Sequence, residues 1–170
     1  KDMGSYEEAK PKYERALEIW EQVHGANHPR VARSLNGLAS LLKDMGSYEE
    51  AKPKHERALE IDERVNGPNH PDVADSLNNL AELLRAMGSY EEAKPKYERA
   101  LEIYEQVHGP DHPEVATDLN NLAGLLETVG SYEEAKPKYE RALEIRERVL
   151  GPDHPYTKQT RNNLKVLLSK

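Results

Sequence analysis

The sequence predicts an all-α solenoid built from antiparallel helix pairs, with about eight helices, and three observations support this fold class. First, the string Gly-Ser-Tyr-Glu-Glu-Ala-Lys-Pro-Lys starts at Gly4 and returns at Gly46, Gly88 and Gly130, each time 42 residues later. Second, apolar residues within each copy recur at helical spacing. Third, no linker separates the copies, so we expect one repeat domain over residues 1–170. Its expected units are approximately 4–45, 46–87, 88–129 and 130–170.

The first helix of each unit, called helix B, is predicted from the copy at residues 47–66. Ser47 and Glu50 have the spacing of a capping box, in which the serine hydroxyl and the glutamate side chain each satisfy a free backbone amide. Pro53 has no N–H to donate and is expected to kink this helix. Gly67 supplies the left-handed position that ends it. Apolar residues recur along the helix at Ala51, Ala58, Leu59, Ile61 and Val65.

The second helix, called helix A, is predicted to run from about Pro71 to the residue before Gly88. Proline is tolerated in the first turn because its missing N–H would have no partner there. The apolar side of this helix contains Val73, Ala74, Leu77, Leu80, Ala81 and Leu84. His70 precedes the helix, and the same position in the other units holds His28, His112 and His154. We interpret these histidines as shaping the start of helix A, because successive copies are separated by a helix B and cannot share one metal ion.

The composition argues against several classes of function. A net charge of −7 disfavours nucleic acid and anionic membranes as partners, because both attract basic proteins. There is no cysteine for thiol chemistry, no apolar run that could span a bilayer, and no phosphate-binding loop, nucleophile elbow or zinc motif. Pairs such as Glu49-Glu50 lie in the first turn of a helix, where negative charge is favourable. We therefore expect a cytoplasmic protein that is not an enzyme and has no cofactor or metal ion.

Part of the repeat resembles a known family. The string Leu77-x2-Leu80-Ala81-x2-Leu84, followed by Ala93-x3-Tyr97, is similar to the tetratricopeptide repeat pattern of a helix pair with a small residue at its crossing point. The 42-residue period resembles the repeats of kinesin light chains and the arrays of many bacterial and archaeal regulatory proteins. The resemblance implies a right-handed superhelix, a concave groove lined by helix A, and binding of a peptide or another protein.

A polar stripe on helix A is the candidate binding surface. In the second unit the stripe steps by three or four residues through Asp75, Asn78, Glu82 and Arg85. Amide side chains both donate and accept, so the repeated asparagines are predicted to hold an extended peptide backbone. An acidic peptide segment is expected near Arg33 and Lys43; the alternative is that these charges only solvate the surface. The full predicted set is Arg33, Asn36, Ser40, Lys43, Asp75, Asn78, Glu82, Arg85, Thr117, Asn120, Glu127 and Asn162.

The two ends of the repeat array differ. The first helix is a helix B that keeps Ala9, Tyr13 and Ala16, although no helix A precedes it. These three residues are predicted to form an uncapped face that could support a homo-oligomer. The last helix is a helix A that carries Arg161 and Lys165 where other units have leucine and alanine, which is typical of a solubilising cap.

Three functions remain open at this stage: a scaffold that binds a peptide or protein, a repeat module that assembles with itself, and the sensor arm of a larger regulatory protein. Because residues 1–4 return at residues 43–46, the chain is expected to begin inside a longer protein. Trp20 corresponds to Asp62, Tyr104 and Arg146. A position that accepts such different side chains is predicted to lie on the outer surface.

Overall fold

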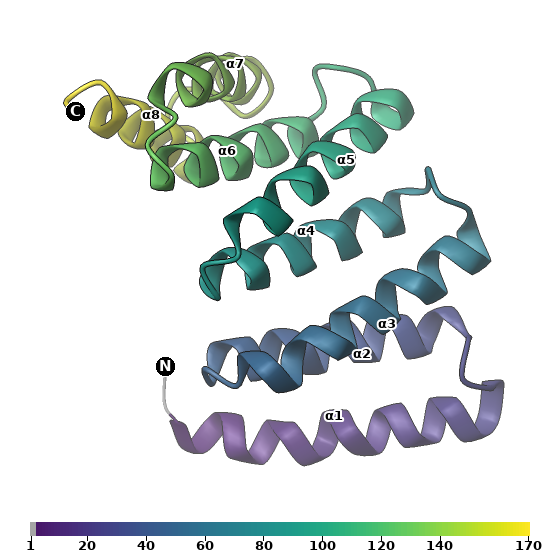
Figure 1. The fold of residues 1–170 in the computed structure, drawn as a ribbon. Helices are drawn as coiled ribbons and strands as arrows, with labels where there is room; N and C mark the ends of the chain where they lie inside the picture. The colour runs from purple at the N-terminus through teal and green to yellow at the C-terminus, as the bar shows by residue number, and fades with distance from the viewer. Residues whose placement is uncertain (1–2) are drawn as a thin grey trace. The chain divides into compact units, whose positions relative to one another are not determined.

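The computed structural model describes residues 3–170, and residues 1–2 lie outside it. The described residues form eight helices joined by short turns and contain no strand, which confirms the all-α prediction (Figure 1). Within these residues no helix combines the length and apolar character needed to cross a membrane. The helices are α1 Met3–His24, α2 Pro29–Asp44, α3 Tyr48–Asn66, α4 Pro71–Ala86, α5 Tyr90–His108, α6 Pro113–Thr128, α7 Tyr132–Leu150 and α8 Pro155–Leu167.

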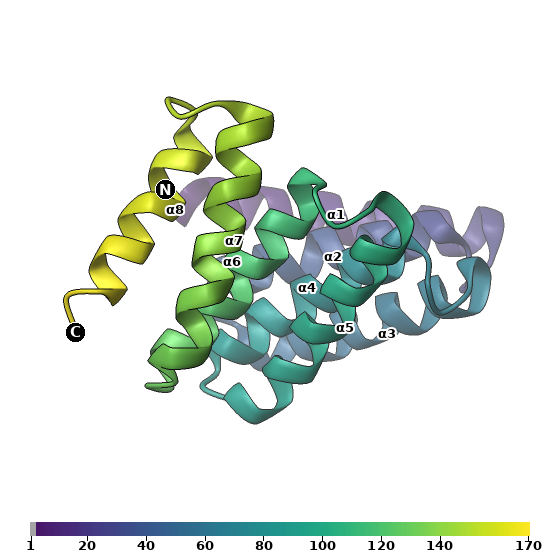
Figure 2. The same ribbon diagram turned by 90° about the horizontal axis from the view of Figure 1, so that it is seen from above.

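The helices group into two compact units. Unit 1 spans Lys1–Ser89 and contains α1 to α4, and unit 2 spans Tyr90–Lys170 and contains α5 to α8. In unit 1, α2 packs against α1, α3 and α4, and α4 also packs against α3. In unit 2, α6 packs against α5, α7 and α8 in the same manner. Within a unit successive helices run antiparallel, as Figure 1 shows for α1 to α4 and Figure 2 for α7 and α8. The single solenoid over residues 1–170 stays a prediction.

The core of unit 1 follows the apolar spacing of the sequence. One cluster joins the first half of α2 to the second half of α3, and another joins the second half of α2 to the start of α3 and to α4. Leu17 of α1 packs against both clusters. Ala51 and Ala58 are fully buried, so their small side chains let α3 approach α2 closely. The residues of the two clusters are Val31, Ala32, Leu35, Ala58 and Ile61, then Leu38, Ala39, Leu42, Ala51 and Leu83.

Each helix A begins at a proline and is capped by the histidine before it, in agreement with the prediction that these histidines shape the start of the helix. His70 has extended backbone angles, and its Nδ1 accepts a hydrogen bond from the backbone N–H of Asp72 at 3.2 Å. Pro71 occupies the first helical position, where no N–H is required. The same cap recurs at 3.2–3.3 Å at His28, His112 and His154.

The capping box predicted at the start of helix B is wrong. Ser47 is the residue before α3, but its side chain makes no capping hydrogen bond, and Ser131 behaves in the same way before α7. The reason is the tight turn through Gly46, whose φ is +81°. This turn directs the backbone N–H of Ser47 to the carbonyl of Leu42 at 2.8 Å, so Glu50 finds no free donor there.

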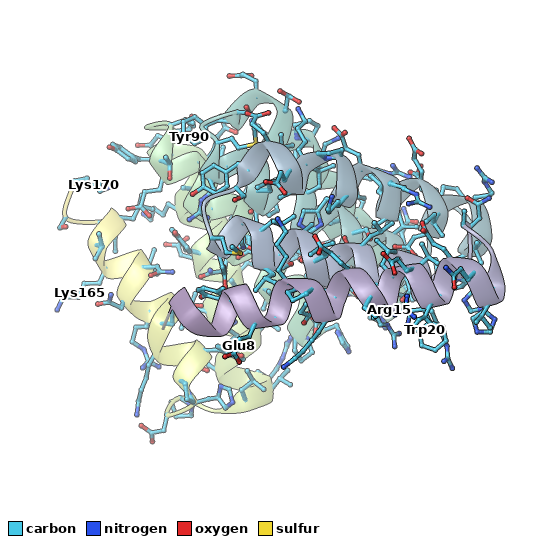
Figure 3. All side chains as sticks on the ribbon, turned by 90° about the horizontal axis from the view of Figure 1, so that it is seen from below. Glu8, Arg15, Trp20, Tyr90, Lys165 and Lys170 are labelled. Atoms are coloured by element: carbon cyan, nitrogen blue, oxygen red, sulfur yellow. The ribbon has the colours of Figure 1, made fainter. Side chains whose placement is uncertain are left out.

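The surfaces of the first and last helices are open in the described structure. Tyr13 is 40% exposed, and Ala9 and Ala16 are partly exposed, whereas the equivalent residues of the later helices B are buried. Figure 3 shows Lys165 projecting from α8, and Arg161 is also exposed.

Candidate functional site: a hollow between α2 and α4

Unit 1 contains a hollow of about 450 Å³ between the N-terminal halves of α2 and α4. Three residues of the predicted binding stripe line it, namely Arg33, Asn36 and Asp75. The volume lies in the range of ~300–1,000 Å³ that is usual for ligand pockets. The complete lining is His28, Pro29, Arg30, Arg33, Asn36, Asp62, Asp72, Asp75 and Asn79.

The walls of the hollow carry opposite charges. Arg30 and Arg33 come from α2, Asp72 and Asp75 from α4, and Asp62 reaches in from α3 with only 6% of its surface exposed. Among the described residues, no ion pair joins either arginine to Asp62 or Asp72. The hollow therefore presents both signs of charge to anything that enters it.

Side chains close to the walls hold some of these charges in place. The guanidinium of Arg30 lies 4.5 Å from the ring centroid of Trp20, which is a cation–π contact. The carboxylate of Asp72 accepts a hydrogen bond from Asn66 Nδ2 at 3.1 Å. Arg33 is exposed and free to pair with a ligand.

A chain of hydrogen bonds leads from the hollow into the core. Ser76 donates its hydroxyl to Asp62 Oδ2 at 2.6 Å, and Asn36 Nδ2 donates to Ser76 Oγ at 2.7 Å. His55 Nδ1 lies 2.7 Å from Asn36 Oδ1. Because the amide oxygen can only accept, His55 must be the donor in this last bond. Both ends of the Asn36 amide are therefore used within the protein.

Burial shifts the acid–base behaviour at both ends of this chain. It raises the pKa of Asp62 from 3.8 to about 6; the hydrogen bond from Ser76 opposes the shift, and the charges of Asp72 and Asp75 add to it. Burial likewise lowers the pKa of His55 from 6.5 to about 4. At neutral pH, Asp62 is therefore mostly ionised and His55 is neutral, which suits the role of His55 as a donor through Nδ1.

The other predicted residues of unit 1 are only partly available to a ligand. Lys43 Nζ forms an ion pair with Glu82 Oε2 at 2.8 Å, so an acidic peptide would have to compete with Glu82 for Lys43. Ser40 and Asn78 are half-buried, and Arg85 is exposed near the end of α4.

The predicted residues of unit 2 are mostly bonded to their own chain. Thr117 Oγ1 accepts from Arg146 Nη2 at 3.2 Å and donates to the Pro113 carbonyl at 3.2 Å. Glu127 accepts from Lys170 Nζ at 2.8 Å and from the Tyr139 hydroxyl at 3.0 Å.

The asparagine positions have a structural role that the sequence did not suggest. Asn36 bridges α2 to α4 through Ser76, and Asn120 Oδ1 accepts from Thr160 and Asn163, both at 3.2 Å, and so bridges α6 to α8. These two asparagines connect one helix A to the next within their units. Asn162 is exposed.

The prediction that Trp20 marks an outer-surface position is wrong. Asp62 is 6%, Tyr104 4% and Arg146 5% exposed at the equivalent sites. Trp20 is half-buried and packs against the apolar cluster of α2 and α3; Figure 3 shows where it lies on α1. In two of the repeats this position contacts the helix A residue 14 positions later, Ser76 for Asp62 and Thr160 for Arg146. The sequence reasoning missed this contact between different helices, because apolar spacing along one helix does not report it.

At this position unit 2 carries a buried cation. Arg146 donates through Nη1 to the Tyr156 carbonyl at 3.1 Å and to Thr160 Oγ1, and through Nη2 to Thr117. The guanidinium therefore fills the space between α6, α7 and α8 with the chain's own donors.

Comparison with solved structures shows extensive similarity. The crystal structure of BtubC (BKLC) from P. vanneervenii superposes with a TM-score of 0.81 and 26% sequence identity, over 95% of this chain and 65% of that one. A Podosopora anserina putative kinesin light chain with nearly identical TPR-like repeats gives a TM-score of 0.83 and 23% identity, over 98% of this chain and 79% of that one. A point variant of that light chain gives 0.84 and 23%, over 98% and 78%.

These comparisons settle the family. This chain spans 65% of the length of BtubC, and the two kinesin light chain structures, at 23% identity, show the fold alone. No curated protein sequence matches significantly. The tetratricopeptide repeat family, however, matches in four overlapping segments, residues 1–63, 32–106, 72–145 and 119–170, which together cover the whole sequence. The chain belongs to the tetratricopeptide repeat family.

Proposed function

We propose that this protein is a non-catalytic scaffold that binds a peptide segment of another protein along the polar face of its A helices. One observation carries the proposal: residues predicted from the repeat register, Arg33, Asn36 and Asp75, line the same hollow of about 450 Å³. Repeats of this family generally serve as protein-interaction scaffolds.

The residues of the predicted stripe divide into three groups under this proposal. Arg33 and Asp75 contact the ligand directly, because they are exposed and line the hollow. Arg85 and Asn162, which are also exposed, extend the surface within their own units. The remaining members hold the neighbouring A helices at the spacing that the ligand needs: Asn36, Ser40, Lys43, Asn78, Glu82, Thr117, Asn120 and Glu127.

The proposed partner is a protein rather than a nucleic acid or a membrane, since the net charge is −7. We also propose that the protein acts in the cytoplasm. The lack of cysteine fits a reducing compartment, where disulfides would not contribute to stability.

An unbiased peptide-display selection tests the scaffold proposal. A library of random peptides is selected against the wild-type chain, and enriched peptides are compared on the wild type and on the Arg33→Glu, Asp75→Lys variant, which reverses two wall charges at constant net charge. We expect about a tenfold loss of affinity in the variant, the usual size for exchanging one good charged contact. Glu56→Gln, on the exposed side of α3, is the control and should have no effect. The proposal fails if no peptide is enriched, or if enriched peptides bind both forms equally.

A second candidate function is self-association through α1. Besides Tyr13, the apolar side chain of Ile19 is 41% exposed, whereas Ile61, Ile103 and Ile145 at the same repeat position are at most 3% exposed. Sedimentation velocity over a range of concentrations distinguishes this function. An increase in mass that Tyr13→Glu abolishes would support it, and a constant monomer would exclude it.

A further inference from the structure

The hollow holds a buried carboxylate, Asp62, that forms no ion pair with any of the described residues. Asp62 is 6% exposed, lines the hollow and accepts a hydrogen bond from Ser76. Among the described ion pairs, none includes Asp62, although Asp72 and Asp75 on α4 add two more negative charges nearby. Burying a carboxylate without a cation is unfavourable, so this site gains more from an added cation than an exposed acid would.

Unit 2 shows which group fits at this place in the fold. With a shift of 84 residues, two repeats, Asp62 corresponds to Arg146, and the groups around it correspond as well: Arg33 to Thr117, Asp72 to Tyr156 and Ser76 to Thr160. In unit 2 the Arg146 guanidinium donates to the side-chain hydroxyls of Thr117 and Thr160 and to the backbone carbonyl of Tyr156. The space enclosed by the corresponding residues of unit 2 thus accommodates a guanidinium. In unit 1, Arg30 and Arg33 line the hollow, but among the described residues neither forms an ion pair with Asp62.

We propose that the hollow of unit 1 is a receptor for an arginine side chain of the partner peptide, whose guanidinium lies against Asp62, Asp72 and Asp75 while an adjacent acidic residue of the same peptide pairs with Arg33. The proposal rests on the scaffold function and specifies its ligand.

The charges and shapes of the two walls favour this ligand over its alternatives. A guanidinium presents several donors in one plane and can bond to two carboxylates at once, whereas an ammonium acts as a point charge. A phosphate or a purely acidic peptide would meet three carboxylates and only two arginines. A purely basic peptide would leave Arg30 and Arg33 without a counter-charge. A peptide segment with one arginine beside one acidic residue brings a positive charge to the aspartates and a negative charge to the arginines.

Binding of this ligand depends on pH in a defined direction. A cation favours the ionised form of Asp62, so affinity falls as the pH is lowered through about 6, where Asp62 takes up a proton. The other ionisable groups facing this carboxylate are Asp72 and Asp75 on α4, His70 before α4, and His28, Arg30 and Arg33 at the start of α2.

The test uses the full chain and three blocked pentapeptides. The probe is acetyl-Ala-Arg-Asp-Ala-Ala-amide. The second peptide replaces arginine with citrulline, which keeps the shape and removes the charge, and the third replaces aspartate with asparagine. Affinities are measured by NMR titration on the wild type, on Asp62→Asn and on the matched control Glu56→Gln. We expect citrulline to weaken binding about tenfold in the wild type and in the control, but less than about twofold in Asp62→Asn.

Further readouts keep the interpretation unambiguous. Thermal unfolding establishes that Asp62→Asn is folded, and Asp75→Asn, at an exposed position, must reduce the arginine preference as well. The carboxyl pKa of Asp62, followed by carbon NMR, should fall when the arginine peptide binds and stay constant with the citrulline peptide. Equal binding of the arginine and citrulline peptides to the wild type, or no binding of either, overturns the proposal. Display-selected peptides that bind the hollow without an arginine would also overturn the arginine proposal but leave the scaffold function intact. If the selection enriches no peptide, both the arginine proposal and the scaffold proposal fail.

Discussion

The hydrogen-bonded chain Asp62–Ser76–Asn36–His55 places two ionisable side chains in the core of unit 1. Burial raises the pKa of Asp62 and lowers that of His55, and both shifts favour the neutral form of the side chain. Ser76 donates a hydrogen bond to Asp62 and accepts one from Asn36, so polar side chains link the two ionisable groups. Each end nevertheless lowers the stability of the fold in its own pH range. At Asp62 the loss of stability comes from burying an ionised carboxylate, and a bound cation would reduce this loss.

Replacing Asp62 with asparagine should stabilise the protein at neutral pH. The pKa of Asp62 is higher in the folded chain, about 6, than its ordinary 3.8, so the folded state binds more protons between these values and stability falls as the pH rises through them. Asp62→Asn keeps an acceptor for Ser76 and removes this loss. The free energy of unfolding of Asp62→Asn, relative to that of the wild type, should be about 2 kcal/mol higher at pH 7 than at pH 4, allowing for screening by solvent in the hollow. Urea unfolding at both pH values measures it, and no pH-dependent difference from the wild type would contradict the shifted pKa.

His55 should change the pH dependence of stability in the opposite direction from Asp62. Its pKa is lower in the folded chain, about 4, than its ordinary 6.5, so the folded state binds fewer protons in this window and stability falls as the pH drops through it. His55→Gln remains neutral at every pH and can still donate to Asn36. Between pH 7 and 4.5, the wild type should lose about 2 kcal/mol more than the variant in urea unfolding. Parallel pH profiles for the two proteins would refute the prediction, and the exposed His24→Gln serves as the control.

At the scale of single elements, the sequence predicted the helices correctly. It also predicted the first turns of the A helices, but not those of the B helices. The 3-and-4 spacing of apolar residues identified the buried side of α2 and α4, because a helix packed on one side needs one apolar stripe. Histidine and proline identified the starts of the A helices. The capping box failed because the N–H of Ser47 belongs to the turn that ends α2, and a pattern of side chains does not report which backbone donors remain free.

The two kinds of helix start should respond differently to alanine. His70→Ala removes the Nδ1 acceptor from the backbone N–H of Asp72 and should cost about 1 kcal/mol. Ser47→Ala removes no capping bond and should change stability by less than about 0.5 kcal/mol. Both substitutions lie in unit 1, so thermal or urea unfolding compares them directly. A larger loss for Ser47→Ala than for His70→Ala would show that the serine hydroxyl contributes after all.

The candidate site was predictable only in part from the sequence. Helical spacing was sufficient to place Arg33, Asn36 and Asp75 on one face, and the structure brings them to one hollow. The floor of the hollow was missed, because Asp62 belongs to a helix B position at which every repeat differs and which therefore resembled solvent-exposed surface. Its burial depends on contact with Ser76 from a different helix, and spacing along one helix contains no information about such a contact.

At the scale of the whole molecule, the 42-residue period was the decisive signal. A repeat that returns with the same apolar residues requires the same packing each time, so the number of helices and their order follow from the period. Equivalent contacts recur in both units: Lys10 pairs with Glu50 at 3.1 Å and Lys94 with Glu134 at 3.2 Å, in each case joining one helix B to the next. The division into two compact units lies outside what the period predicts, since no residue at the boundary departs from the repeat.

Aromatic residues at one repeat position should differ in importance according to their place in the array. Tyr139 is 2% exposed, and Tyr139→Ala should cost about 3–5 kcal/mol through the cavity it leaves and the lost bond to Glu127. Tyr13, at the same repeat position, is 40% exposed, and Tyr13→Ala should cost about 1 kcal/mol. Urea unfolding of the two variants provides the comparison. Similar losses would indicate that the α1 face is covered in solution, which would favour self-association.

The exchange between Asp62 and Arg146 has a consequence for how such arrays acquire new partners. In unit 2 Arg146 fills the space beside its helix A, whereas in unit 1 Asp62 lines a hollow there, and the buried alanines and leucines of α2 and α3 recur in α6 and α7. Under the proposed function, a substitution at this position changes what a repeat binds and leaves the residues that pack its helices unchanged. The four repeats already carry four different side chains at this position, tryptophan, aspartate, tyrosine and arginine in turn.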